Sequence, residues 1–236
     1  MDRNIEGAAD EGLLAAVRAA LVTAAEPEKA PAMQAYMKSA MPYLGVPKPA
    51  RERALRPVFA ARVLPDAAVW SATVLALWRR AQFREERYAA IDLTGHRAYL
   101  AYQRAETLDL YDEMITTGAW WDYVDEVAAR RVGPLLAARP EVIRPVILRW
   151  CCDGNLWRRR SSIICQLSFK AATDLDLLYT CIDANLDDQD FFIRKAIGWA
   201  LRQYARTDPA EVGRFVSARS DRISPLSRRE ALKNIG

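Results

Sequence analysis

The sequence predicts an all-α fold built from stacked helix pairs. Apolar residues recur at helical spacing nearly throughout the 236 residues, and neither a convincing two-residue strand alternation nor an Asn-Gly hairpin signal is found. The connections between the apolar stretches are short, and the elements alternate as pairs rather than as four long bundle helices. With 51% hydrophobic residues, the chain can bury a substantial core as one domain or as a continuous repeat array.

Proline and glycine mark several ends of the predicted helices. Pro49, Pro140 and Pro209 stand near helix starts, where the missing N–H of proline is tolerated. Gly118 and Gly154 stand near helix ends. The predicted helices cover residues 11–25, 29–41, 48–63, 66–80, 84–101, 104–117, 120–138, 140–152, 155–170, 174–186, 190–206, 209–218 and 224–235.

An approximate repeat appears in the second half of the chain. Helices that begin near Trp121, Trp157 and Phe192 lie 36 and 35 residues apart, and another helix follows each of them. This spacing is nearest to the HEAT-like class of repeats. We therefore predict an α–α superhelix of HEAT-like helix pairs, a curved solenoid forming a single domain over residues 1–236, whose inner helices line a concave groove.

Three polar or aromatic residues share a stripe with the aromatic residue that leads each of these helices. Asp125 follows its leader by four positions, Arg160 by three and Trp199 by seven, which places each on the leader's helix face. The stripe could equally be buried, in which case the aspartate and the arginine would need partners. In a groove, both side chains would have a use.

The segment from Trp120 to Glu126 combines two indoles with an acidic cluster at a helix start. Trp121 and Asp125 are four positions apart and share a helix face, an arrangement that suits an electron-poor ligand. Acidic residues can also simply complement a helix N-terminus, which would explain Asp122 better than Asp125. Trp120 and Val124 are expected to pack the repeat.

Basic residues permit a nucleic-acid partner without demonstrating one. Of the 34 basic residues 28 are arginine, whose planar fork suits phosphate oxygens, but a GC-rich genome would raise arginine and alanine together. The run Arg158, Arg159 and Arg160 places three cations at a helix start, where the helix dipole prefers anions. This arrangement favours recruitment of an external anion.

Several classes of protein are disfavoured by composition. His96 is the only histidine, which excludes two-histidine metal motifs, and a packing or solvated role is favoured for it. The four cysteines form no C-x-x-C pair and are expected to be reduced core thiols, so we predict neither a metal nor a cofactor. Neither a signal peptide nor an apolar stretch long enough for a membrane span is found, and a cytoplasmic protein is the expectation.

Five ordered segments resemble the AlkD family of HEAT-like DNA alkylpurine glycosylases. They span roughly residues 30 to 235, so chance is a poor explanation for their order. The segments are Tyr36-Met37-Lys38 with Leu44-Gly45; Trp120-Trp121-Asp122-x-Val124-Asp125; Asn155-Leu156-Trp157-x-x-Arg160 with Gln166-Leu167-x-x-Lys170; Phe191-Phe192-Ile193-x-Lys195-Ala196-Ile197-Gly198-Trp199; and Pro225-Leu226-Ser227-x-Arg229-Glu230-Ala231.

The resemblance implies roles for individual residues. Asp125 matches the family's catalytic carboxylate, and Trp121 and Trp199 match the indoles that cradle the deoxyribose of the lesion. Arg160 matches an arginine that contacts the DNA backbone, and Tyr36 matches an aromatic residue near the lesion. The set predicted to bind DNA is Arg160, Tyr36, Lys38, Arg159, Arg194 and Lys195. The chain departs from the family at Pro47, where the best-known members carry a glutamine, so contacts to the opposite strand or base are expected to differ.

The resemblance also implies a reaction. The expected enzyme is a hydrolase that acts as a monomer on double-stranded DNA and removes cationic N3- or N7-alkylated purines, including bulky adducts, in base excision repair. It needs neither a metal nor a cofactor, and it leaves the modified base exposed. Two alternatives stay open: a helical-repeat DNA-binding protein without catalysis, and a HEAT-like protein-binding scaffold.

Overall fold

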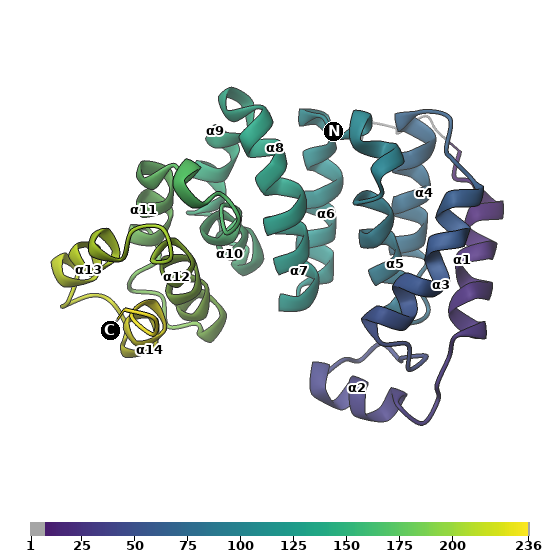
Figure 1. Cartoon of the computed structure of the whole chain (residues 1–236), viewed down its shortest axis with the longest axis horizontal. Coiled ribbons are helices and arrows are strands. Elements are labelled where there is room, and N and C mark those ends of the chain that lie inside the picture. Colours follow the sequence, from purple (N-terminus) through teal and green to yellow (C-terminus); the bar gives the residue numbers. More distant parts are fainter. Residues whose placement is uncertain (1–7, 236) are drawn as a thin grey trace. The chain divides into compact units, whose positions relative to one another are not determined.

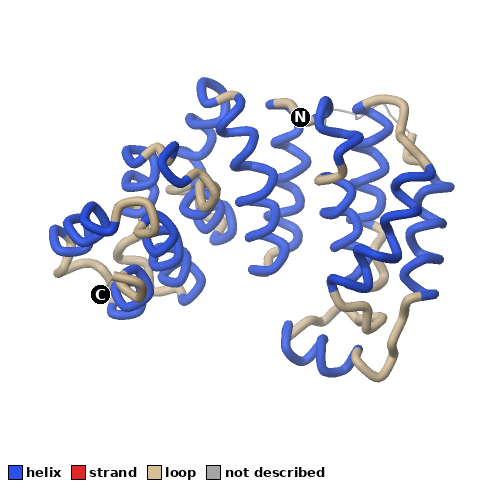
Figure 2. The backbone as a smooth tube through the Cα atoms, in the orientation of Figure 1, coloured by secondary structure: helices blue, strands red, loops and turns tan. Residues whose placement is uncertain are grey.

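The computed structural model describes residues 8–235, and its secondary structure consists of helices joined by turns and loops (Figure 1, Figure 2). No strand occurs in residues 8–235, so the predicted all-α class is confirmed. Packing divides the chain into two compact units, Met1–Leu110 and Tyr111–Gly236. The single domain expected over residues 1–236 stays a prediction.

The first unit is built on one apolar stripe of its first helix. Leu13, Val17 and Leu21 are spaced four apart, are fully buried and lie on α1, which packs against α3, α4 and α5. Asp10 caps this helix by accepting a hydrogen bond from the N–H of Leu13. The elements of this unit are α1 (Glu11–Thr23), α2 (Ala30–Met37), α3 (Lys48–Ala61), α4 (Ala67–Arg79), α5 (Arg84–Thr94), and the 3-10 turns η1 (Arg97–Tyr102) and η2 (Ala105–Thr107).

A buried carboxylate holds the turn between α2 and α3. Glu85 is fully buried and accepts hydrogen bonds at 3.0 Å from the N–H groups of Leu44, Gly45 and Val46. Gly45 has φ +83°, and a Cβ there would lie 2.0 Å from the carbonyl oxygen of Glu26, so the position requires glycine. This turn leads directly into α3, which begins at Lys48, the first residue of the predicted helix 48–63.

The second unit is organised around α10, which packs against α7, α9, α11 and α12. Its fully buried residues include Ile164 of α10, Val124 of α7 and Ile197 of α12. The elements are α6 (Leu108–Gly118), which begins before the boundary, α7 (Trp121–Val127), the π turn η3 (Ala128–Val132), α8 (Gly133–Ala138), α9 (Pro140–Trp150), α10 (Leu156–Ile164), the 3-10 turn η4 (Lys170–Ala172), α11 (Leu175–Asp183), α12 (Phe191–Tyr204), α13 (Pro209–Ala218) and α14 (Pro225–Ala231).

Helices α12 and α14 approach each other closely at a glycine. A Cβ at Gly198 would lie 2.5 Å from the Cβ of Glu230 and 2.9 Å from the carbonyl oxygen of Ser227. The hydroxyl of Ser227 also donates a 2.9 Å hydrogen bond to the carbonyl oxygen of Arg194. Because Gly198 precedes Trp199, this contact fixes the part of α12 that carries the second indole.

Three predicted helices are interrupted in ways that periodicity does not detect. The helix expected over 84–101 ends at Thr94, because His96 has an extended ψ of 134° and the chain continues as a 3-10 turn. The helix expected over 155–170 ends at Ile164. The helix expected over 120–138 contains the π turn η3, since Pro134 has no N–H with which to continue the regular bonding pattern.

Candidate active site

Trp121 and Asp125 of α7 and Trp199 of α12 line one pocket of about 360 Å³ in the second unit. The structure therefore brings together the three residues for which catalytic roles were predicted, although the roles themselves stay predictions. The other lining residues are Asp122, Glu126, Ala129, Arg130, Leu167, Ser168 and Gln203.

The register of α7 determines which side chains line this pocket. Trp121, Asp125 and Ala129 recur every four residues and face the pocket. Tyr123 and Val124, on the other face, are fully buried in the core. The helix thus separates a packing face from a pocket face, and a carboxylate follows an indole along the pocket face.

Asp125 and Arg160 form a bidentate pair. Nε of Arg160 donates to Oδ1 of Asp125, and Nη2 donates to Oδ2, each at 2.7 Å. The third nitrogen, Nη1, donates to the carbonyl oxygen of Phe192 at the start of α12. Arg160 is 4% exposed and ties α7, α10 and α12 together. The phosphate contact predicted for this arginine stays a prediction, since all three of its nitrogens are bound to the protein here.

Opposing effects act on the Asp125 carboxyl. Burial raises the pKa of this group above its ordinary value of 3.8. The hydrogen bonds and charge of Arg160 lower the pKa, whereas the nearby charge of Asp122 adds to the rise. The bidentate geometry fits an ionised carboxylate, which accepts through both oxygens. Burial therefore opposes the negative charge that the bidentate pairing with Arg160 favours on this carboxyl group.

Aromatic side chains at the N-terminal ends of α7, α10 and α12 pack against one another. The ring centroid of Phe192 lies 5.4 Å from that of Trp120 and 5.1 Å from that of Trp157. These are the aromatic residues at or beside the starts of the three helices in the predicted repeat. The packing role expected for Trp120 and Val124 agrees with this arrangement, because Val124 is fully buried and Trp120 packs against both rings.

The arginines at the start of α10 bind carboxylates of the protein itself. Arg158 donates to both oxygens of Asp112 at 2.7 and 2.6 Å, and to Asp153 at 3.2 Å. The N-cap residue Asn155 accepts from the N–H groups of Trp157 and Arg158, which satisfies the first turn of the helix. The positive charge of Arg158 is therefore neutralised by carboxylates of the protein itself, at the helix start where the sequence predicted an external anion.

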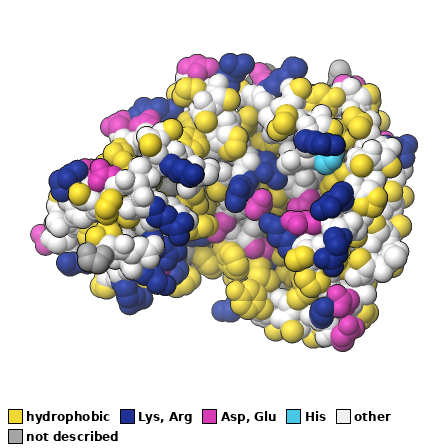
Figure 3. All heavy atoms as spheres, in the orientation of Figure 1, with side chains coloured by type: hydrophobic (Ala, Val, Ile, Leu, Met, Phe, Trp, Pro, Cys, Tyr) yellow, Lys and Arg dark blue, Asp and Glu magenta, His cyan; other side chains and the backbone are white. Residues whose placement is uncertain are grey.

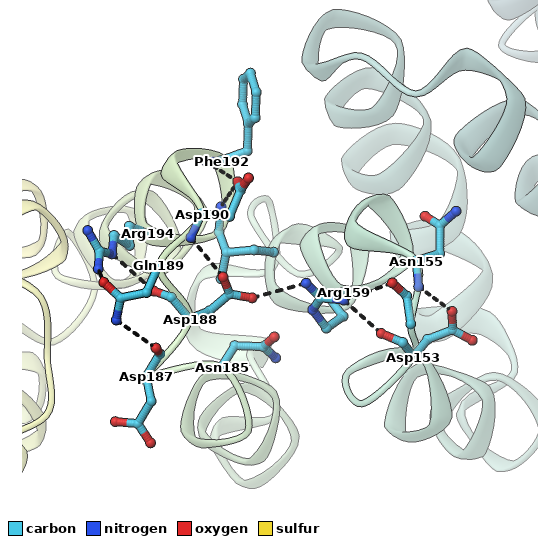
Figure 4. Close-up of polar contacts among 12 residues, drawn as sticks. Asp153, Asn155, Arg159, Asn185, Asp187, Asp188, Gln189, Asp190, Phe192 and Arg194 are labelled. Atoms are coloured by element: carbon cyan, nitrogen blue, oxygen red, sulfur yellow. Dashed lines mark hydrogen bonds and ion pairs between the residues drawn. The ribbon is translucent and has the colours of Figure 1, made fainter.

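Arg159 joins the loop before α10 to the loop before α12, as Figure 4 shows. Its guanidinium donates to the carbonyl oxygens of Asp153 and Gly154, and to Oδ2 of Asp188 at 3.0 Å. Asp190 then caps α12 by accepting from the N–H of Phe192 at 2.7 Å. The starts of α10 and α12 are thereby fixed to each other near the aromatic packing.

Two further residues predicted to bind DNA are also engaged by protein groups. Arg194 donates to the carbonyl oxygen of Asp188 and to the side chain of Gln189 (Figure 4). Lys195 pairs with Glu230 of α14 at 3.1 Å. Both side chains connect parts of the second unit, and their predicted DNA contacts stay predictions.

Tyr36 and Lys38 belong to the first unit, at the end of α2. Tyr36 is 76% exposed, and Lys38 is exposed with a left-handed backbone at φ 49°. Such an exposed aromatic side chain beside a cation is available to a ligand. Neither residue lies in the pocket of the second unit.

Sequence reasoning missed Gln203, Ser168 and Arg130 as lining residues. Gln203 follows Trp199 by four positions, so the same helical periodicity that selected the indole could have found it. Ser168 lies in the predicted helix 155–170, but α10 ends at Ile164. Helical spacing therefore does not give the direction of the Ser168 side chain. Arg130 lies in the π turn, which shifts the register of the residues that follow.

Other chemical groups lie apart from the pocket. His96 packs against the rings of Phe59 and Tyr99, with centroids 5.9 and 5.6 Å away, as expected of a packing histidine. Three of the four cysteines are buried, and all four are free. Among residues 8–235, no cluster of histidine, cysteine and carboxylate side chains is arranged to hold a metal ion. No helix of the same range combines the length and apolar character needed to cross a membrane.

Together, these features define an all-helical protein of packed helix pairs with an acidic, indole-lined pocket. A family model described as DNA alkylation repair enzyme matches residues 17–235, and the chain belongs to this family. The resemblance found in the sequence motifs is thereby confirmed. A solved structure, a predicted DNA alkylation repair enzyme from Enterococcus faecalis, is 30% identical and superposes with a TM-score of 0.78 over 90% of this chain and 97% of that chain. No curated protein matches the chain.

Proposed function

We propose that this DNA alkylation repair enzyme is a monofunctional DNA N-glycosylase for cationic N3- and N7-alkylated purines. The single observation that carries the proposal is the pocket in which Asp125 lies with Trp121 and Trp199. A protein that only bound DNA would gain nothing from a buried carboxylate facing a polyanion. An enzyme whose reaction develops positive charge on the substrate would be helped by this carboxylate, because its negative charge stabilises the transition state.

The proposed reaction suits a carboxylate without a strong general acid. An alkylated purine carries a positive charge, so the electron pair of its N-glycosidic bond returns to the base, which departs as a neutral molecule. Positive charge develops on the deoxyribose, and Asp125 stabilises that charge. Water adds at C1′ and releases its proton, leaving an abasic site and the free base.

The neighbours of Asp125 have distinct proposed tasks. The faces of Trp121 and Trp199 add cation–π stabilisation to the developing sugar charge. Arg160 acts as a positioning residue, because its fork fixes both oxygens of the carboxylate and keeps the group ionised despite its burial. Substrate recognition through the backbone around the lesion is consistent with removal of bulky as well as small adducts.

Replacing Asp125 with asparagine tests the proposal. Asp125→Asn keeps the shape and one acceptor for Arg160 but removes the negative charge. We expect single-turnover release of a cationic alkylpurine from duplex DNA to fall by roughly 100-fold or more, while DNA affinity stays nearly intact. Mass spectrometry identifies the released base.

Asp176→Asn is the matched control, since its side chain is 82% exposed on α11, away from the pocket. Base release by this variant should equal that of the wild type. Unchanged release by Asp125→Asn would overturn the assignment of the catalytic carboxylate. Absence of release by the wild type from any alkylated duplex would overturn the glycosylase proposal.

A further inference from the structure

A second pocket, of about 290 Å³, adjoins the candidate active site. The two pockets share Leu167, Ser168 and Gln203 as lining residues, so they form one continuous depression within the second unit. The second pocket is also lined by Gln166, Lys170, Thr173, Arg206 and Thr207. No role in the proposed reaction has been given to this pocket.

The depression follows one face of α12 from the proposed catalytic residues to the end of the helix. Trp199 and Gln203 are four residues apart on α12 and share a helix face, and Arg206 lies in the turn that follows the end of the helix at Tyr204. Trp199 lines the first pocket, Gln203 lines both, and Arg206 lines the second. A ligand whose reacting part lies at Trp199 would therefore extend along α12 toward Arg206.

The second pocket carries two cations that are not neutralised by the protein. Lys170 and Arg206 are exposed, and neither has a carboxylate within ion-pair distance among residues 8–235. This distinguishes them from Arg159, Arg160 and Lys195, each of which is bound to an internal carboxylate. An anion would reach Lys170 and Arg206 without breaking an existing ion pair. Figure 3 shows Lys and Arg side chains gathered over α12 and α14 on the visible face of this unit.

Lys170 is held in place by a well-bonded turn. Its backbone is left-handed, with φ 54°, a conformation that a non-glycine residue adopts only when its surroundings impose it. The amide of Gln166 bonds to both backbone groups of Asp174, at 3.0 and 2.8 Å, and the hydroxyl of Thr173 donates to the carbonyl oxygen of Lys170. The turn thus presents the lysine at the rim from a fixed backbone.

Neutral donors complete the lining at the junction of the two pockets. The side chains of Ser168, Gln203 and Thr207 make no hydrogen bond to another protein group in the part of the chain that the structure describes. Hydroxyl and amide groups of this kind accompany lysine and arginine in contacts with phosphate oxygens, which carry no sequence information. The combination suits a phosphodiester rather than a base edge.

We propose that this second pocket, lined by Lys170 and Arg206, binds the phosphodiester backbone of the damaged strand beside the lesion. The inference rests on the proposed function for the orientation of the strand, since the lesion's sugar would occupy the first pocket. It assigns the backbone contact to cations that are free to make it, in place of the paired arginines at the starts of α10 and α12.

The test measures the salt dependence of binding to an undamaged duplex. In Lys170→Gln, Arg206→Gln and the double variant, each lost cation should flatten the plot of log affinity against log salt concentration by about 0.9 per phosphate contact. Arg139→Gln is the control, because Arg139 is exposed and lines neither pocket. Circular dichroism and thermal unfolding should match the wild type, since both substituted side chains are exposed.

Neutral methylphosphonate linkages then locate the contacted phosphates. Placed one at a time along one strand of the duplex, they should weaken wild-type binding at one or two positions and cause no further loss in the double variant at those positions. A wild-type slope in the double variant would overturn the proposal while leaving base release untouched. A flattened slope, together with no base release by the wild type, would retain the phosphate site and remove only the glycosylase proposal.

Discussion

Asp125 of α7 and Arg160 of α10 face each other through two parallel hydrogen bonds of 2.7 Å, 35 residues apart in the chain. The side chains are only 15% and 5% exposed, so the pair is shielded from water and salt. The pair joins α7 and α10, the first helices of two consecutive predicted repeats. It also fixes the Asp125 carboxylate in the pocket that Trp121 and Trp199 line. The same contact occupies the arginine that the sequence predicted for the DNA backbone.

The rate of base release should depend on ionisation of Asp125. The carboxylate stabilises positive charge only when deprotonated, so the single-turnover rate falls as pH decreases through its pKa. Because burial raises this pKa above 3.8, the acid limb should lie above that value. The measurement compares rates across pH at saturating enzyme, with spontaneous depurination subtracted. A rate that stays constant down to the ordinary pKa of an aspartate would contradict the assignment.

Removing Arg160 should shift this acid limb to higher pH. The hydrogen bonds and charge of Arg160 lower the pKa of Asp125, so their loss in Arg160→Gln leaves the effect of burial unopposed. We therefore expect the pH at which the rate of base release begins to fall to be higher in Arg160→Gln than in the wild type. Arg160→Lys retains the charge and should restore part of the shift.

The salt dependence of DNA binding separates this positioning role from a phosphate contact. With its three nitrogens bound to protein, Arg160 should contribute nothing to the salt slope, which Arg160→Gln should leave unchanged. A slope flattened by about 0.9, with the acid limb unmoved, would instead support the backbone contact predicted from the sequence. If Arg160→Gln folds poorly, the pH profile of Arg160→Lys still tests the positioning role.

Helical periodicity predicted much of the fold, and together with the family resemblance it predicted that three site residues would converge. Trp121 and Asp125 share a face at any helical register, and Trp199 occupies the matching stripe of a later repeat. The local sequence could not show which carboxylate each arginine would meet. Arg158 binds Asp112, 46 residues away in the sequence, and Arg159 binds Asp188, 29 residues away. Whether such pairs meet depends on how the helices stack.

Helical periodicity also could not predict where α10 ends or where the second pocket forms, because both depend on contacts within a turn. The end of α10 depends on the turn in which the side chain of Gln166 bonds to the backbone of Asp174. The secondary-structure propensities of these two residues do not predict this contact. Lys170 has a left-handed backbone in that turn, although lysine has no intrinsic preference for it. The residues that line the second pocket therefore become recognisable only once this turn is formed.

Gly198 should tolerate no side chain, because α14 packs against it. A methyl group at this position would lie 2.5 Å from the Cβ of Glu230 and 2.9 Å from the carbonyl oxygen of Ser227, so Gly198→Ala must displace α14. We expect a loss of about 1 to 3 kcal/mol in the free energy of unfolding, measured by denaturant titration. Base release should fall as well, since Trp199 is the next residue and small displacements of reacting groups are costly.

Gly213→Ala provides the matched control for this prediction. Gly213 also lies within a helix, α13, but no heavy atom lies within 4 Å of the position its Cβ would take. Alanine is the better helix former, so this variant should be as stable as the wild type or more stable by about 0.5 to 1 kcal/mol. Equal stability of Gly198→Ala and Gly213→Ala would show that α14 accommodates the methyl group, and that close packing at Gly198 does not fix Trp199.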